Sequence, residues 1–425
     1  MSERGGELAD VFRREAGRCT ATLIRILGDV ELAEDAVAEA FAIAAEAWPR
    51  SGTPPNPGAW ITTTARNRAI DRLRRESSRP GRHLAAHRLL ETNMDSDPNP
   101  DRNAQLNELD DFVDVVADDQ LRLMFLCCHP ALGTDAQVAL TLRLLGGFET
   151  PDIAKAFVVP EETMAQRLVR AKRKLRDNHA PYRVPSTAEL PDRLHAVLAA
   201  ISVVFTAGHT AIRGDELLQV DLCDEAIRLG RVIVELMPDE PEAVGLLALM
   251  LLTDARRAAR TDASGQMIRL ADQDRTKWDR ARIAEGHELV RACLRRNEPG
   301  MFQIQAAIAA VHADAVHAPN TDWRQIVALY DQLYTLRPDS VVATNRAIAI
   351  GALDGPAAGL LALELIDADA VATYQPFHAA RADLLARCGR TADAAAAYER
   401  AIELTDNPIE RRFLEERRAT TRRVT

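Results

Sequence analysis

Residues 136–177 read AQVALTLRLLGGFETPDIAKAFVVPEETMAQRLVRAKRKLRD and contain three helical patterns separated by short turns. The first pattern, 136–145, ends at a pair of glycines, which are common just after a helix. The second, 151–157, starts with a proline behind a capping threonine, and a Val-Val-Pro turn separates it from the third, 161–176. A helix, a short turn and a basic helix are typical of a helix-turn-helix unit, so this stretch predicts an α-helical fold.

The third pattern has one apolar face and one polar face. Four apolar residues fall within about 60° of one another at about 100° per residue, and we expect them to face a core. They are Met164, Leu168, Ala171 and Leu175. The adjoining polar stripe consists of Thr163, Gln166, Arg167, Arg170 and Lys174. Six basic residues and no acidic one occur between Thr163 and Arg176, which favours a nucleic-acid-binding surface.

Residues 29–48 predict a helix with an acidic exposed face. Gly28 ends the preceding helix, and Asp29 is suited to cap the new one. The predicted buried stripe consists of Ala33, Val37, Ala40, Phe41, Ala44 and Trp48. Asp35 and Glu39 lie on the opposite side, and no lysine or arginine occurs in this segment. A face of one charge can be merely solvated, but here the sign of the charge reverses just downstream.

That reversal occurs in a second helix, predicted to begin near residue 59 after the turn-forming Asn56 and Pro57. It carries five arginines, Arg66, Arg68, Arg72, Arg74 and Arg75, against Asp71 and Glu76. The arginine fork matches phosphate oxygens, so the helix is suited to nucleic acid. Trp60 at its entrance is suited either to stacking on an unpaired base or to anchoring the core, and the sequence leaves both open. From Glu91 to Asp119, ten carboxylates face a single arginine, which predicts an acidic linker grading into a helix.

Together these stretches resemble a sigma factor of the extracytoplasmic-function type in the sigma-70 family. LGDVELAEDAVAEAFAIAAEAW (27–48) is similar to the region 2 helix that binds the coiled coil of the largest polymerase subunit. PNPGAWITTTARNRAIDRLRR (55–75) is similar to the next helix, which reads the melted −10 promoter element. Residues 136–177 are similar to region 4, whose helix-turn-helix reads the −35 element. The resemblance covers roughly the first 180 residues and implies core RNA polymerase and promoter DNA as partners.

The resemblance also implies roles for individual residues. Polymerase docking would involve Asp35, Glu39 and Phe41, although the periodicity puts Phe41 at the edge of the core. The −10 element would be read by Trp60, Arg66, Asn67, Arg68, Asp71, Arg72, Arg74 and Arg75. The −35 element would be read by Thr163, Gln166, Arg167, Arg170, Lys172, Arg173 and Lys174. In this last set we expect Gln166, Arg167 and Arg170 to contact bases, each worth roughly 1–3 kcal/mol of discrimination, and the other basic residues to contact phosphates.

From residue 190 onward, amphipathic helical patterns alternate with short loops and show an internal echo. Ala226, Gly230, Ile233 and Pro238 recur with the same offsets as Ile326, Tyr330, Leu333 and Pro338. A third copy, Ala394, Tyr398 and Ala401, keeps the first two offsets, but Asp406 stands in the place of the proline. These segments resemble the second helices of tetratricopeptide repeats, which stack into superhelices. Ordinary members of the family end near residue 176, so the resemblance implies that this extension modulates activity in cis, by an intramolecular or partner-protein contact.

Composition bounds the remaining possibilities. The chain has 425 residues, 47% apolar and only 4% aromatic, with abundant alanine and leucine, which favours an all-α fold. Its formal net charge of −10 excludes a globally basic coat protein. It has no nucleophile-elbow, phosphate-loop or zinc-protease motif, so we expect no enzymatic activity and no cofactor.

The cysteines and the first residues indicate the compartment. The six cysteines form no Cys-x-x-Cys pair, and Cys127 and Cys128, followed by His129, are better explained as buried residues than as a metal site. The first residues are charged and lack an apolar leader segment. We therefore expect a cytoplasmic protein with no metal and no membrane contact.

The sequence thus predicts an all-α protein with region 2 at 1–80, an acidic linker at 81–119, region 4 at 120–180 and a helical domain at 186–425. The leading function is a sigma factor whose C-terminal domain modulates its activity. The alternative is a helix-turn-helix regulator that binds duplex DNA without polymerase docking and senses a partner through its repeats. A tetratricopeptide scaffold with no DNA role ranks last, since it leaves both basic helices unexplained.

Overall fold

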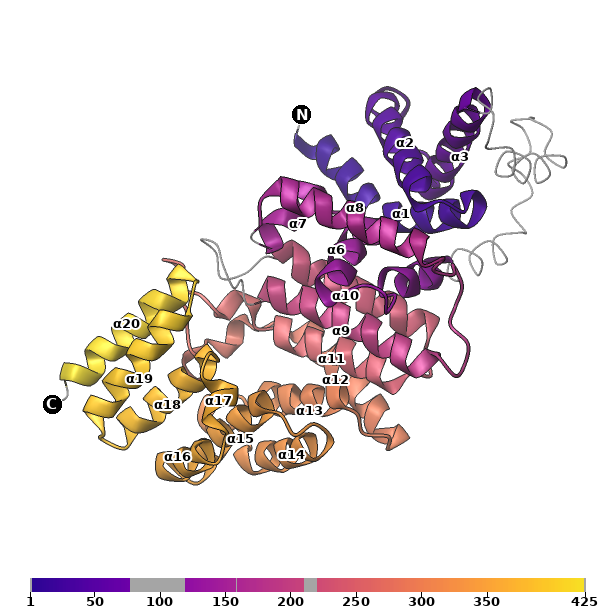
Figure 1. The fold of residues 1–425 in the computed structure, drawn as a ribbon. Helices are drawn as coiled ribbons and strands as arrows, with labels where there is room; N and C mark the ends of the chain where they lie inside the picture. The colour runs from indigo at the N-terminus through magenta and orange to yellow at the C-terminus, as the bar shows by residue number, and fades with distance from the viewer. Residues whose placement is uncertain (1, 77–118, 158, 210–219, 424–425) are drawn as a thin grey trace. The chain divides into compact units, whose positions relative to one another are not determined.

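The computed structural model describes residues 2–76, 119–157, 159–209 and 220–423 (Figure 1). In these ranges the chain forms α-helices, short 3₁₀ turns and one isolated bridge between Thr261 and Met267, with no strand. The prediction of an all-α fold is confirmed. The chain divides into two compact units, residues 1–200 and residues 201–425.

The first unit begins with helices α1 (Ser2–Leu27), α2 (Val30–Ser51) and α3 (Pro57–Glu76), which pack against one another. Gly28 separates α1 from α2 with a φ of +68°, and Asp29 caps α2 by accepting a hydrogen bond from the amide of Leu32 at 3.0 Å. The side chain of Asn56 accepts from the amide of Ala59 at 3.0 Å and starts α3 in the same way. Every residue of the stripe predicted for α2 is buried, and Ala36 is buried with them.

The second half of this unit contains a helical segment at 119–127 followed by α6 (Thr134–Leu144), α7 (Thr150–Phe157) and α8 (Glu161–Asp177). The helices α6, α7 and α8 pack together, and the predicted apolar seam of α8 is its buried face. The hydroxyl of Tyr182 donates to the carbonyl oxygen of Ala21 at 2.7 Å and to that of Asp119 at 2.9 Å. This tyrosine therefore ties the chain beyond α8 to α1.

The division between the units falls within α9 (Leu190–His209). By length and composition α9 could cross a membrane, a property that core helices of soluble proteins share. Short 3₁₀ turns, η3 to η6, cover Arg257–Ala259, Leu270–Asp272, Arg275–Lys277 and Ala318–Asn320. The remaining helices are α10 (Val220–Leu236), α11 (Pro241–Asp254), α12 (Arg280–Arg296), α13 (Met301–Asp314), α14 (Trp323–Leu336), α15 (Ser340–Leu353), α16 (Pro356–Glu364), α17 (Ala368–Val371), α18 (Gln375–Arg387), α19 (Thr391–Leu404) and α20 (Pro408–Arg423).

In the second unit, most helices that follow one another along the chain pack against one another, and its core includes three apolar clusters among the described residues. The first three echoing positions of each copy lie on α10, α14 and α19, and most of them are buried, whereas Pro238, Pro338 and Asp406 follow the ends of these helices. Gly230 packs closely against α11, since an added Cβ would lie 2.6 Å from the end of the Met250 side chain, whereas the other two copies have Tyr330 and Tyr398 at this position. Gly389 joins α18 to α19 with a φ of +77°, which favours glycine. Whether these helices are tetratricopeptide repeats stays a prediction.

Candidate interfaces for polymerase and promoter DNA

The acidic face of α2 is exposed as expected. Asp35 and Glu39 both lie on the surface. Asp35 also accepts a hydrogen bond from the guanidinium of Arg72 on α3, at 3.0 Å, with both side chains about half exposed. Phe41 differs from these acids because it is only 6% exposed and packs edge-on against Phe12, with ring centroids 4.6 Å apart. Phe41 therefore supports this face from the core and is not part of the exposed surface.

On α3, the predicted −10 residues divide between the core edge and the surface. Trp60 is half-buried and packs edge-on against Trp48, with ring centroids 5.4 Å apart, so it anchors the α2–α3 pair while keeping part of its ring accessible. Asn67, Arg68 and Asp71 are exposed, and Arg66 and Arg72 are half-buried. The side chains of Arg74 and Arg75 lie outside the described residues, as does the acidic linker predicted at 81–119, except for Asp119. This aspartate is buried at the start of the helical segment 119–127, where it pairs with Arg25 and Arg122.

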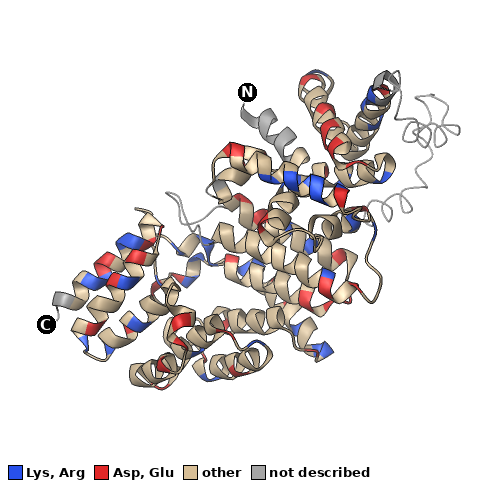
Figure 2. Ribbon diagram, viewed as in Figure 1, with Lys and Arg blue, Asp and Glu red and all other residues tan. Residues whose placement is uncertain are grey.

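The polar stripe of α8 is largely exposed, and Figure 2 shows its basic residues close together along this helix. Thr163, Gln166, Arg170 and Lys174 lie on the surface, as does Arg173, which pairs with Asp177 at 3.4 Å. Arg167 is less free, because its guanidinium bonds to Asp135 at 3.3 Å and lies 5.6 Å from the ring centroid of Phe157. The helix-turn-helix packing thus fixes the orientation of Arg167.

Sequence reasoning missed the role of Glu34, which links α2 to α6 and α8. Its carboxylate accepts hydrogen bonds from the amine of Lys172 and from the guanidinium of Arg143, both at 2.5 Å. Close by, Arg176 bonds to Glu31 at 3.3 Å. Burial by itself would raise the pKa of Glu34, but the charges and hydrogen bonds of Lys172 and then Arg143 outweigh it and hold that pKa below its ordinary value.

This arrangement changes the interpretation of Lys172. The sequence placed its amine among the phosphate contacts, yet in this structure the side chain is only 16% exposed and bonded to Glu34. The carboxylate of Glu34 therefore accepts the hydrogen bond that the Lys172 amine would otherwise donate to a DNA phosphate. The periodicity of α8 already sets Lys172 apart, since it lies outside the stripe of Gln166, Arg170 and Lys174. The neighbouring sequence does not indicate that its partner is Glu34.

Three families match separate parts of the chain. Sigma-70 region 2 matches residues 11–79, and Sigma-70, region 4 matches residues 122–175. The chain is an extracytoplasmic-function sigma factor. Residues 193–294 match a family of unknown function (DUF6596), so this sigma factor carries a C-terminal extension. It belongs to the same family as an uncharacterised protein of Rhizobium meliloti (strain 1021), 41% identical over 392 residues that cover 92% of this chain and 90% of the relative. No solved structure matches the chain.

The family match decides between the functions considered above. The sigma factor directs RNA polymerase to promoters, and a free-standing regulator would not require region 2. The matched segments include all the residues predicted for polymerase docking and for the two promoter elements. Sigma factor families are not enzymes. None of the matched families is described as a tetratricopeptide repeat.

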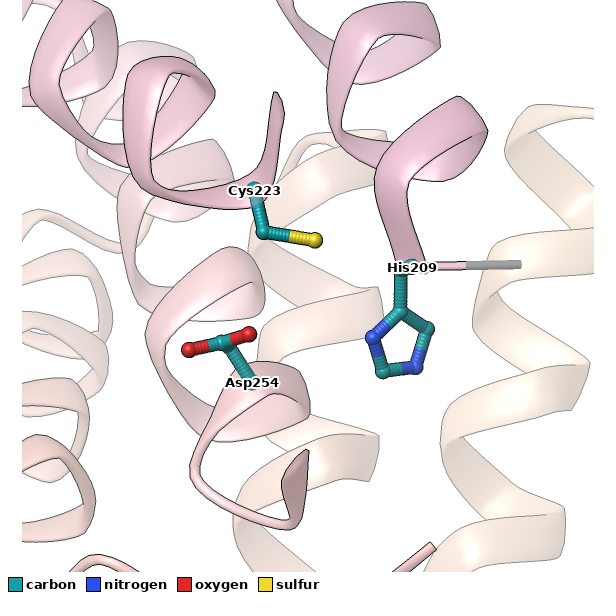
Figure 3. Close-up of side chains that lie close together, drawn as sticks. All are labelled: His209, Cys223 and Asp254. Atoms are coloured by element: carbon teal, nitrogen blue, oxygen red, sulfur yellow. The ribbon is translucent and has the colours of Figure 1, made fainter. Parts of the chain in front are cut away.

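The extension of the sigma factor contains a cluster of three potential metal ligands, His209, Cys223 and Asp254, whose ligand atoms lie within 4.8 Å of one another (Figure 3). Both oxygens of Asp254 lie against guanidinium groups, because Arg257 bonds to one at 2.9 Å and Arg282 contacts the other. Burial, followed by the charges of Arg260, Arg256 and Arg257, lowers the pKa of His209 to about 2, so its imidazole is neutral at pH 7. The positive surroundings disfavour a cation here, and the cluster is best explained as a buried charge network.

The adjacent cysteines Cys127 and Cys128 lie in the protein core. Cys127 and Cys128 are buried at the end of the helical segment 119–127, and burial raises the pKa of both thiols. Both are therefore unreactive thiols at neutral pH.

Proposed function

We propose that this sigma factor docks on core RNA polymerase through the exposed acidic face of α2, with Asp35 and Glu39 as the contacting side chains and Phe41 as their support. The observation that carries the proposal is the exposure of Asp35 and Glu39 on a helix whose apolar stripe is fully buried and which has no lysine or arginine before Arg50 in its last turn. Such a surface steers association with a basic partner.

The promoter-reading residues are proposed in the same way. Asn67, Arg68 and Arg72 on α3, with the accessible part of Trp60, contact the melted −10 strand. Gln166, Arg167 and Arg170 on α8 contact bases of the −35 duplex, and Arg173 and Lys174 contact its phosphates. The assignment is supported by the exposure of Asn67, Arg68, Gln166, Arg170, Arg173 and Lys174 and by the partial exposure of Trp60, Arg72 and Arg167. Lys172 joins the phosphate contacts only when its bond to Glu34 opens.

The C-terminal unit acts in cis on this machinery, in a cytoplasmic protein without enzymatic activity. Two features support control in cis. The extension is large, and because it is part of the same chain as regions 2 and 4, its effective concentration near these regions is high. Contact with a separate partner protein through the same unit is part of this proposal.

In vitro transcription with purified core polymerase and the cognate upstream promoter tests the docking surface. The double variant Asp35→Lys/Glu39→Lys should abolish specific transcripts while retaining the helical content of the wild-type protein. A matched variant, Asp192→Lys/Asp369→Lys, makes the same change of charge at exposed acids of α9 and α17 and should transcribe normally. Normal output from the α2 variant would refute the docking proposal, and so would equal loss in both variants.

A further inference from the structure

The C-terminal unit contains a cavity of about 740 Å³ that none of the assigned functions uses. Its wall includes residues of the η4 and η6 turns, the start of α14, and the helices α15, α18, α19 and α20. Elements from residue 267 to residue 417 therefore meet around it. A volume of this size is within the range of about 300–1,000 Å³ that is typical of small-molecule sites.

Most of the cavity wall is apolar and aromatic. Trp323 lies at the start of α14, Tyr398 on α19, and Phe413 and Leu414 on α20. Tyr398 and Leu414 belong to the apolar cluster that holds α18, α19 and α20 together, so this part of the wall is fixed by the core. Such a wall favours a ligand with an apolar body, because burial of apolar surface supplies most of the binding free energy.

The charged groups of the wall are mostly positive. Four arginines, Arg269, Arg275, Arg387 and Arg417, accompany a single carboxylate, Asp383. Asp383 is already paired with Arg417 at 2.6 Å and with Arg387 at 3.8 Å. Arg269 directly precedes η4 and binds the half-exposed Asp272 through its Nε at 2.6 Å, so a ligand carboxylate at the cavity would share this guanidinium with Asp272. The wall thus has more cationic groups than its own carboxylate neutralises.

Arg275 provides a second, independent indication of a ligand. Its side chain is 8% exposed, and one terminal nitrogen donates to the carbonyl oxygens of His312 and Ala315, both at 2.6 Å. The guanidinium also lies over the ring of Trp278, 4.5 Å from its centroid. Its Nε–H, however, is buried with no acceptor among the described residues. Among the described residues this guanidinium bonds to carbonyl oxygens and pairs with no carboxylate, so an anion in the adjoining cavity would offset its uncompensated charge.

We propose that this cavity binds a small organic carboxylate with an aromatic or similarly sized apolar body. The apolar wall receives the body, and the arginines bind the carboxylate through charge-assisted hydrogen bonds. A cation is disfavoured by the four guanidinium groups, and a highly charged phosphate ester is disfavoured by the apolar lining. The inference concerns binding alone and does not depend on how the unit affects transcription.

Isothermal titration calorimetry on the full-length protein, with indole-3-acetate and its neutral amide as probes, tests the proposal. We expect indole-3-acetate to bind and indole-3-acetamide to bind about tenfold more weakly, since only the carboxylate pairs with arginine. Arg269→Gln should weaken the binding of indole-3-acetate about tenfold with little effect on folding, because Arg269 is exposed and its ion pair with Asp272 lies at the surface. Arg346→Gln, which removes a half-buried arginine paired with Asp331 outside the cavity, is the matched control and should bind normally.

A second variant blocks the cavity without removing charge. Ala271 is exposed at the rim, on the short η4 turn, so Ala271→Trp should fill the cavity, preserve the fold and abolish binding of indole-3-acetate. Equal binding of the acid and the amide would overturn the proposal, as would unchanged binding in both Arg269→Gln and Ala271→Trp. A third outcome is that the wild-type protein does not bind indole-3-acetate but binds an acidic aromatic peptide. If both variants lose this peptide binding, the cavity is a peptide site and the small-molecule proposal is wrong.

Discussion

The carboxylate of Glu34 on α2 accepts a hydrogen bond from the amine of Lys172 on α8, at 2.5 Å. The two residues are separated by 138 positions in the sequence, and they join the helix proposed to bind polymerase to the helix proposed to bind the −35 element. Since Glu34 also holds Arg143 of α6, one side chain contributes to both the folding of region 4 and its placement beside region 2.

Glu34 should make stability depend on pH in the acidic range. Because its folded-state pKa lies below the ordinary value, its contribution is present at neutral pH and is lost as the pH falls through that lowered pKa. We expect Glu34→Gln to cost about 1–3 kcal/mol at pH 7 and progressively less toward pH 3. Thermal unfolding at several pH values measures this. Glu39→Gln, an exposed residue of the same helix, is the control and should show no such convergence with the wild-type curve.

Arg170 and Arg173 should differ in their effects on DNA binding. Both are exposed on α8, but Arg170 belongs to the stripe expected to face the bases. Arg170→Ala should cost about 1–3 kcal/mol on the cognate −35 duplex and much less on an altered duplex. Arg173→Ala should weaken both duplexes alike and reduce the salt slope by about one. Titrations with both duplexes at several salt concentrations decide this, and the same pattern in both variants would argue against separate roles.

Removing the C-terminal unit should change promoter-specific transcription by about fivefold or more, in the range of typical coupling between sites. The truncation is best made after His209, because Arg193 of α9 bonds to the carbonyl oxygen of Phe125 and packs over its ring within the first unit. In vitro transcription compares residues 1–209 with the full chain, after circular dichroism has shown that the shorter chain is helical. Output equal to that of the full chain would eliminate control in cis.

Asp254 should be a strong determinant of stability in the extension. It is 2% exposed and neutralises Arg257 and Arg282, so Asp254→Asn leaves two partly buried guanidinium groups with a weaker partner. We expect a loss of about 3 kcal/mol in the free energy of unfolding. Chemical denaturation measures it, with Asp239→Asn as the comparison, since that carboxylate is 94% exposed and should contribute little. Asp224 also pairs with Arg257 at 2.7 Å and with Arg282 at 3.4 Å, so a small effect at Asp254 would mean that Asp224 alone satisfies these arginines.

Local features of the fold were predictable from the sequence. The bounds 161–176 for the basic helix differ from the observed α8 by a single residue, and its four seam residues are its buried residues. The caps at Asp29 and Asn56 were also correct. These features depend on residues within one or two turns of each other, where helical periodicity and capping chemistry act directly.

The sequence by itself determined the helices, their buried stripes, the helix-turn-helix and the charged surfaces, since each follows from neighbouring residues along the chain. Only the tertiary structure decided that Lys172 bonds to Glu34, that Phe41 packs on Phe12, and that the arginines of the second unit surround one cavity. The physical reason is the same in each case. Residues brought together from distant segments meet through the packing of whole helices, and no local period or cap encodes which faces will touch.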